Sequence, residues 1–296
     1  MTMSTDGSRE RIETPSNPEL HGSLRSVPSP VRWIIETHSL TKKYHDHVVV
    51  DGLTLAISSG QIFGLLGPNG AGKSTFMKML VTLLPPTSGT ASIAGIDLLQ
   101  HPSLVRQEIG YVPQLLSADS MLTGYENLLI FAQLYDLPRQ ERTLRIEQAL
   151  KTAGLSDVAQ NLVGTYSGGM IRRLEIVTAT LHRPKILFLD EPTVGLDPVA
   201  RHGIWRQIRG FVDDHGMTVV LTTHQMDEAD AICDRIAIMV SGKVRALGTV
   251  DELKAGMNIP EATLDDVFSF YAGSTNQTGE QFRDIATTRR AAARLG

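Results

Sequence analysis

A nine-residue segment, GPNGAGKST, constrains this chain more than any other feature of its sequence. The segment follows the apolar run IFGLL, begins at Gly67, and precedes the helix-like run FMKMLVTLL. A strand, a glycine loop and a helix in this order are the context in which G-x-x-x-x-G-K-[ST] is a P-loop. Glycines at Gly67, Gly70 and Gly72 allow the sharp turn that makes successive backbone N–H groups converge on phosphates. The sequence therefore predicts a nucleotide phosphate cradle.

Three side chains of this loop have predicted chemical roles. Lys73 would reach the β- and γ-phosphates, the Ser74 hydroxyl would ligate Mg²⁺, and Thr75 would add a donor near the α-phosphate. A chance match to the motif occurs in roughly one chain in a hundred of this length, and the flanking strand and helix lower that rate. The predicted nucleotide contacts of the loop are Gly67, Pro68, Asn69, Gly70, Ala71, Gly72, Lys73, Ser74 and Thr75.

A P-loop needs an acid on a neighbouring strand to help hold Mg²⁺. The segment KILFLDEP supplies an apolar strand that ends in Asp190 and Glu191. We expect Asp190 to bind Mg²⁺ through water and Glu191 to orient and polarise the attacking water. An apolar strand ending in acids is more often structural when it occurs alone, and the P-loop changes that interpretation.

The order of patterns along the chain predicts an α/β fold. Short β-rich runs begin at Trp33, and a helical pattern occupies about residues 105–175, which indicates an all-helical inserted subdomain. Apolar strand-like runs then return in KILFLDEP, MTVVLTTH and RIAIMVSGKV. Helices alternating with fully apolar strands predict a mainly parallel core sheet that is covered on both faces. Residues 1–30, rich in Ser, Pro and charge, are expected to be disordered.

Composition excludes several classes of function. The chain has 296 residues and a formal net charge of −4, so it lacks the basic character of a nucleic-acid-binding domain. Its single cysteine, Cys233, is expected to be a small core residue and cannot form an intrachain disulfide. The N-terminal residues do not resemble a signal peptide. No apolar run approaches the roughly 20 residues that span a bilayer.

A second phosphate-binding signal appears in YSGGM, in which two glycines follow Ser167 where a helical pattern begins. YSGGM before LFLDEP, followed by GLDP and by a histidine after VVLTT, resembles the ATP-binding cassette (ABC) family of transporter ATPase subunits. The resemblance covers roughly residues 33–272. It implies a P-loop NTPase with an antiparallel β subdomain on the N-terminal side, within a domain at 31–272 that a polar and basic tail at 273–296 follows.

The resemblance also implies roles for individual residues. Tyr44 corresponds to the aromatic residue that stacks on adenine, although a lone tyrosine is more often a surface residue. Gln114 corresponds to the glutamine that contacts Mg²⁺ and water and borders the membrane-subunit docking groove. His224 corresponds to the histidine that contacts the γ-phosphate, although a lone histidine is more often structural. Asp197, in GLDP, corresponds to the loop that crosses to a partner subunit.

In this family two cassettes enclose two ATP molecules head to tail. Ser167, Gly168 and Gly169 would therefore meet the γ-phosphate held by the P-loop of a partner cassette, most simply an identical copy. Tyr166 and Met170 depart from the usual leucine and glutamine of this signature. The resemblance implies that a glutamine contact near the ribose is lost, which would affect the strength of closure. Similar YSGGM signatures occur in the daunorubicin/doxorubicin-resistance branch.

The segment from Pro260 to Gly273 resembles the end of export cassettes, and its alternative interpretation is a closing amphipathic helix. The basic tail, with Arg283, Arg289, Arg290 and Arg294, is either a solvated end or a contact with lipid or a permease.

Together these features predict the ATP-hydrolysing subunit of an export complex for a drug, antibiotic or other hydrophobic compound. The resemblance implies ATP and Mg²⁺ as cofactors, a separate integral membrane permease, no nucleic-acid partner, and a peripheral location on the cytoplasmic face of the membrane. The alternative is a cassette ATPase of translation or DNA repair, although those proteins usually carry tandem cassettes or long insertions. A GTPase or small-molecule kinase is less consistent, because N-K-x-D is absent and YSGGM would be unexplained.

Overall fold

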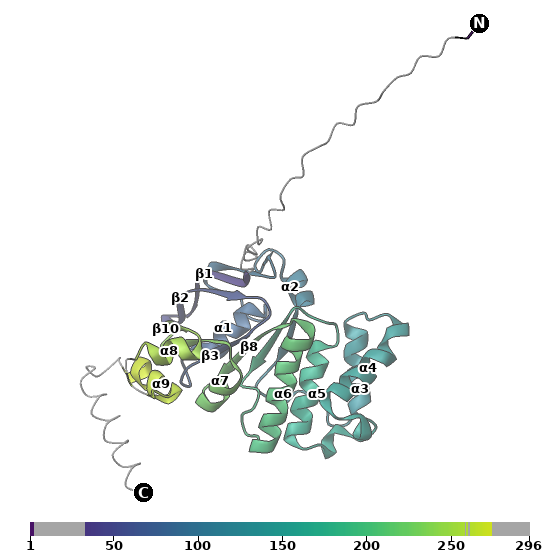
Figure 1. Ribbon diagram of the computed structural model, residues 1–296. Coiled ribbons are helices and arrows are strands. Elements are labelled where there is room, and N and C mark those ends of the chain that lie inside the picture. Colours follow the sequence, from purple (N-terminus) through teal and green to yellow (C-terminus); the bar gives the residue numbers. More distant parts are fainter. Residues whose placement is uncertain (3–32, 258, 260, 274–296) are drawn as a thin grey trace. The chain divides into compact units, whose positions relative to one another are not determined.

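Two β-sheets form the framework of the computed structural model, which describes residues 1–2, 33–257, 259 and 261–273 (Figure 1). The larger sheet has the strand order β10-β9-β3-β8-β7-β6, and the smaller has the order β2-β1-β4-β5. The expectations for residues 3–30 and for the basic residues of the tail fall outside the described residues. None of the helices in the described ranges has the length and apolar character needed to cross a membrane.

The core sheet is mainly parallel, as predicted. Its strands are β3 (Ile62–Leu66), β6 (Ile109–Val112), β7 (Ile186–Asp190), β8 (Thr218–Thr223), β9 (Arg235–Val240) and β10 (Lys243–Gly248). The pairs β3/β8, β3/β9, β7/β8 and β6/β7 are parallel, and only β10 runs antiparallel to its neighbour β9. The P-loop and the segment that begins with Glu191 therefore leave the sheet on the same side, at the carboxyl ends of β3 and β7.

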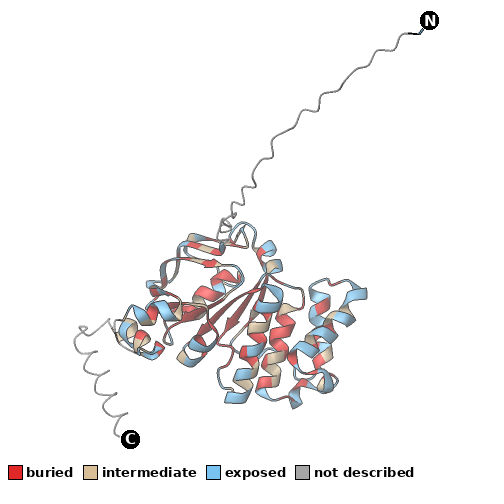
Figure 2. Cartoon of the chain, in the orientation of Figure 1, coloured by how far each residue is buried: buried red, intermediate tan, exposed pale blue. Residues whose placement is uncertain are grey.

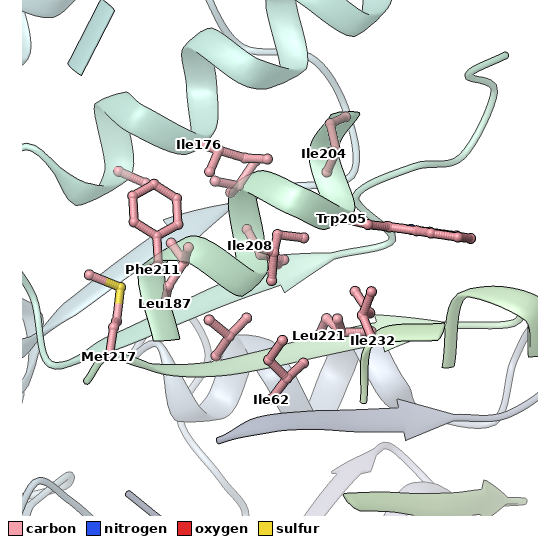
Figure 3. Close-up of a cluster of buried hydrophobic side chains, with 14 of the residues drawn as sticks. Ile62, Ile176, Leu187, Ile204, Trp205, Ile208, Phe211, Met217, Leu221 and Ile232 are labelled. Atoms are coloured by element: carbon pink, nitrogen blue, oxygen red, sulfur yellow. The ribbon is translucent and has the colours of Figure 1, made fainter. Parts of the chain in front are cut away.

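Both faces of the core sheet are covered, which explains why its strands are apolar throughout. Side chains alternate between two cores along each strand: Leu187 and Leu189 belong to one core, whereas Ile186 and Phe188 belong to the other. Figure 2 shows these strands as buried. In Figure 3, the first core contains strand residues packed against the helices of one face, among them Ile62, Leu187 and Leu221 with Ile176, Ile204, Ile208 and Phe211.

The second core lies between the other face of the core sheet and the antiparallel sheet. That sheet consists of β1 (Trp33–Tyr44), β2 (His47–Ser58), β4 (Ser88–Ile93) and β5 (Ile96–Asp97). All of its pairs are antiparallel, as the resemblance implied. Helix α1 (Lys73–Leu80) contributes Phe76, Met77 and Met79 to this core, and so the helix that follows the P-loop is anchored between the two sheets.

The remaining helices are α2 (Pro102–Glu108), α3 (Gly124–Leu134), α4 (Arg139–Ala153), α5 (Gly168–Thr180), α6 (Pro198–His215), α7 (Met226–Ile232), α8 (Val250–Ala255) and α9 (Leu264–Gly273). Two short 3₁₀ turns, at Ser156–Val158 and Val163–Thr165, connect α4 to α5. Helix α3 begins with a capping box between Thr123 and Glu126.

The expectation of an all-helical segment over about 105–175 is wrong at its start. The segment includes β6, the edge strand that pairs with β7. β6 spans only four residues, IGYV, too few for a periodic pattern to separate a strand from the adjoining helices. The helical part begins with α3.

Two further sequence interpretations concern buried positions. Cys233 is a buried core residue with its Sγ close to Gly64, and burial raises the pKa of its thiol. Helix α9 lies within the segment that resembles the end of export cassettes, and it packs Leu264 and Val267 into the same core as β9. The closing-helix interpretation is therefore confirmed for the described residues of that segment.

Candidate active site

The P-loop turns between β3 and α1 through backbone conformations that require glycine. Gly72, the residue before α1, has φ 101°, and a Cβ there would lie 2.5 Å from the carbonyl oxygen of Val49. A Cβ on Gly67 would collide with the carbonyl oxygen of Met239. The loop is thus pressed against β2 and β9, which leaves its outer side available for phosphate.

Lys73 lies at the base of the loop with only 5% of its surface exposed. Its Nζ donates to the carbonyl oxygens of Gly67 (2.7 Å) and Pro68 (3.1 Å) and lies 3.8 Å from Glu191 Oε1. Burial lowers the pKa of Lys73, and the nearby charges of Glu191 and Asp190 oppose that shift. The ammonium is thus held within the loop, beside the carboxylates at the end of β7.

Asp190 and Ser74 offer a pair of oxygens suited to a hard cation. Ser74 Oγ donates to Asp190 Oδ1 over 3.0 Å, and Thr222 Oγ1 donates to the same oxygen over 2.5 Å. Asp190 is 3% exposed, so its carboxylate is oriented by these two hydroxyls. Carboxylate and hydroxyl oxygens fit Mg²⁺, which binds few protein ligands and retains water. The chemistry of this donor set is therefore consistent with the predicted metal.

Glu191 contacts three of the other predicted site residues. Its Oε2 accepts from Gln114 Nε2 (3.0 Å), and its Oε1 lies 3.1 Å from His224 Nδ1 as well as near Lys73. The backbone at Glu191 has φ 49°, a left-handed conformation that is uncommon for a side-chain-bearing residue. Its N–H is held by Thr222, through the carbonyl oxygen (3.1 Å) and Oγ1 (3.0 Å). Strained backbone conformations of this kind are common at functional sites.

A cavity of about 450 Å³ opens over these residues. Its lining contains ten of the predicted site residues, together with Val49 and Val194: Asn69, Gly70, Ala71, Gly72, Lys73, Ser74, Thr75, Gln114, Glu191 and His224. This volume suits a small-molecule ligand of nucleotide size. The structure therefore brings the P-loop, the glutamine, the glutamate and the histidine to one pocket.

Tyr44 does not line this cavity. It ends β1 at the hairpin to β2, is 44% exposed, and has Lys42 Nζ 5.2 Å from its ring centroid. The ring is accessible, and its stacking on adenine stays a prediction.

The serine–glycine segment also lies outside the lining of this cavity. Ser167 is exposed and caps α5 by accepting from Met170 N (3.3 Å), and Gly168, the first residue of that helix, is also exposed. Asp197 caps α6 in the same way, by accepting from Val199 N and Ala200 N. A Cβ on Gly169 would approach the Ala200 side chain to 2.7 Å. Gly169 thus allows the starts of α5 and α6 to pack together.

Comparisons with known proteins agree with this geometry. A family model described as ABC transporter matches residues 50–194. The daunorubicin/doxorubicin resistance ATP-binding protein DrrA of Streptomyces peucetius is 45% identical over 237 residues, which are 79% of this chain and 72% of that protein. The chain belongs to the ABC transporter family. It is an ATP-binding ATPase subunit of that family.

Other relatives of this ABC ATPase extend the comparison. The Nod factor export ATP-binding protein I of Rhizobium meliloti is 40% identical over 82% of this chain and 71% of its own length. A solved ATP-binding subunit of an ABC transporter superposes with a TM-score of 0.72 at 30% identity, over 80% of this chain and 99% of that one. A dimeric ATP-binding cassette bound to ADP and Pi superposes with a TM-score of 0.65 at 28% identity, over 73% and 98%.

The unusual Tyr166 of this cassette has a structural role. Its ring is buried, and its hydroxyl donates to the carbonyl oxygen of Val158 over 2.6 Å. A Cβ on Gly124 would collide with the same hydroxyl, so the first residue of α3 packs directly against it. Tyr166 therefore ties the start of the Ser167 segment to the helical part, a contact that a leucine could not make.

One residue of the site was not predicted. Thr222 orients both Asp190 and Glu191. Thr222 could have been suspected, because a hydroxyl at the end of a buried apolar strand needs a partner.

Proposed function

We propose that this ABC ATPase is the energy-supplying subunit of an export complex and works with a separate integral membrane permease. Its relatives include proteins described by drug resistance and by Nod factor export, which favours export over import. The proposed cargo is a drug, antibiotic or other hydrophobic compound. The proposed location is the cytoplasmic face of the membrane, where the permease would hold the subunit.

The observation that carries the hydrolytic mechanism is the environment of Glu191. Glu191 is 6% exposed, and its carboxylate contacts a lysine, an amide and an imidazole, all of them also lining the cavity. A carboxylate restrained in this way is suited to accept a proton from water, or to orient water, at a fixed point beside the P-loop. Catalysis then consists of positioning and charge stabilisation.

The other residues supply positive field and donors around the γ-phosphate. Lys73 would exchange its loop carbonyls for phosphate oxygens, and His224 would donate to the γ-phosphate. Gln114 would hold Glu191 and the attacking water in their relative positions. Mg²⁺, held by Ser74 and Asp190 with Gln114 beside them, would neutralise phosphate charge when bound. Tyr44 would stack on the adenine.

The functional unit that we propose is a head-to-tail pair of identical chains. Ser167, Gly168 and Gly169 are absent from the lining of the chain's own cavity, yet Ser167 and Gly168 are exposed at the start of a helix, where N–H groups attract anions. They would complete the cavity of the partner, with Asp197 crossing beside them. Each chain would thus hold half of two sites.

Replacing Glu191 with Gln tests the proposed mechanism. The amide keeps the size of the side chain but cannot accept the proton, so ATP binding should persist while kcat falls by about 10²-fold or more. Size-exclusion chromatography with ATP should show a stable dimer, because the bound γ-phosphate would no longer be removed. A variant that hydrolyses ATP at the parental rate would contradict the role of Glu191.

Co-purification tests the proposed partner. The full chain, expressed in its own host and extracted in detergent, should retain a polytopic membrane protein. Recovery with ribosomes or DNA instead would favour the non-transport alternative.

A further inference from the structure

Two side chains of helix α5 form hydrogen bonds with the backbone of the loop that carries Gln114. Residues 113–119 are the first part of the connection from β6 to α3 and form neither helix nor strand. The apex of this loop is apolar and accessible, with Leu115 81% and Leu116 48% exposed. Such a segment has few contacts of its own, and its position therefore depends on the groups that hold its backbone.

Arg172 holds the start of this loop. Its NH1 donates to the carbonyl oxygen of Pro113 (2.7 Å) and its NH2 to that of Gln114 (2.5 Å). The residue is 3% exposed, which is rare for an arginine unless it is paired. The planar guanidinium fork thus fixes two successive carbonyls, one of them belonging to the residue that contacts Glu191.

Glu175 holds the middle of the same loop. Its Oε1 accepts from the backbone N–H of Ser117, from Ser117 Oγ (3.1 Å) and from Ala118 N (3.2 Å). Its Oε2 lies 3.0 Å from Arg172 NH1 and accepts no hydrogen bond within the described part of the chain. The two residues form one buried ion pair, and each also binds the loop.

These contacts connect two parts of the proposed reaction centre. Along one chain they run from Glu191 to Gln114 and from Gln114 to Arg172. Ser167 lies about 1.4 helical turns before Arg172, at the start of α5. Glu191 lines the chain's own pocket, whereas Ser167 would complete the pocket of a partner chain. A helix segment of this length moves as one body, so a shift of the loop would be transmitted to Ser167.

We propose that Arg172 and Glu175 are positioning residues that couple the Gln114 loop of one site to the Ser167 edge lent to the other. This role rests on the proposed head-to-tail pair. The clamp itself, the hold of these two residues on the loop, does not depend on that proposal, so the two can be tested separately.

Limited proteolysis tests the clamp. Thermolysin cleavage at Leu115 or Leu116 of the full chain should accelerate about tenfold or more in Arg172→Gln, the factor expected for losing a charge-assisted hydrogen bond. The matched control is Arg173→Gln, because Arg173 donates to Ala153 in the helical part and not to the loop. Equal cleavage of parent and Arg172→Gln would overturn the proposal.

A double variant separates positioning from simple neutralisation of charge. Arg172→Gln alone leaves the Glu175 carboxylate buried and unpaired, and this can destabilise the fold. Arg172→Gln combined with Glu175→Gln removes that cost but does not restore the fork. We expect its thermal stability to recover while kcat stays about tenfold to a hundredfold below the parent, with KM for ATP unchanged. Full recovery of kcat would mean that the pair only balances charge and would overturn the proposal.

Mixed dimers test the coupling. One chain carries Lys73→Ala, so it has no functional pocket but still lends Ser167 to the parental pocket of its partner. Adding Arg172→Gln to the Lys73→Ala chain should lower kcat at that distant pocket, and an unchanged kcat would overturn the coupling. Adding Ser167→Glu instead should abolish the activity. If it does not, the head-to-tail pair fails, whereas the proteolysis result still decides the clamp.

Discussion

At the scale of single residues, the site depends on backbone conformations that ordinary side chains disfavour. Gly72 and Glu191 both have positive φ, one where the P-loop enters α1 and the other where the chain leaves β7. Glycine removes the cost at the first position. At Glu191 the unfavourable left-handed conformation remains, and the two hydrogen bonds from the Glu191 N–H to Thr222 hold the strained residue in place.

Replacing Gly72 with Ala tests the steric limit in the loop. The new methyl group would meet the Val49 carbonyl oxygen, so the free energy of unfolding should fall by about 1–3 kcal/mol more than left-handed strain alone predicts. Gly95→Ala is the control, since Gly95 has φ 80° and nothing within 4 Å of an added Cβ. Urea denaturation of the two variants measures the difference. Equal losses would show that φ, and not the close approach, is what selects glycine at Gly72.

At the scale of elements, one buried carboxylate joins the segment after β7 to α6 and α7. Glu228, on α7, is 1% exposed and accepts from Thr193 Oγ1 (2.7 Å) and from Trp205 Nε1 of α6 (3.1 Å). Burial raises its pKa above the usual 4.5, although hydrogen bonds from Thr193, Thr223 and Trp205 oppose the shift. The elements that carry Glu191 and His224 are thus tied to each other behind the pocket.

The raised pKa predicts a pH dependence of stability. The folded state binds the proton of Glu228 more tightly than the unfolded state does, so this contribution to stability is complete below pH 4.5 and is lost as pH rises through the raised pKa. Glu228→Gln should remove that loss, and its stability relative to the parent should increase with pH over this window. Urea denaturation across pH measures it. A constant difference between the two proteins would contradict the shift.

At the scale of the whole molecule, the pocket and the serine–glycine segment are separate parts of one chain. The cavity collects Gln114, Glu191 and His224 with the P-loop, whereas Ser167 and Asp197 cap the starts of α5 and α6 outside its lining. Ser167 and Gly168 form an exposed helix start outside the lining of the chain's own cavity. Its proposed use therefore requires two molecules.

Complementation tests that requirement. Lys73→Ala homodimers lack both phosphate cradles, and Ser167→Glu homodimers would place a carboxylate against each γ-phosphate, so each variant alone should be inactive. Their mixture contains heterodimers with one intact composite site, and random pairing should restore up to about a quarter of the parental ATPase rate. A mixture that stays inactive, or an active Ser167→Glu homodimer, would contradict the composite site.

The sequence by itself determined the P-loop, the acidic strand end and the parallel core, because these depend on local spacing and periodicity, and its motifs carried the resemblance to the family. Two carboxylates that follow an apolar strand must lie at the edge of the sheet where the P-loop lies, whatever else packs around them. The tertiary structure decided the partners of each group. Thr222 contacts Asp190 and Glu191, and Arg172 contacts the carbonyl oxygen of Gln114. The two residues in each of these contacts are more than thirty positions apart in the sequence. Only tertiary packing determines which distant hydroxyl or guanidinium reaches a buried oxygen, and the periodicity of the sequence does not encode these pairings.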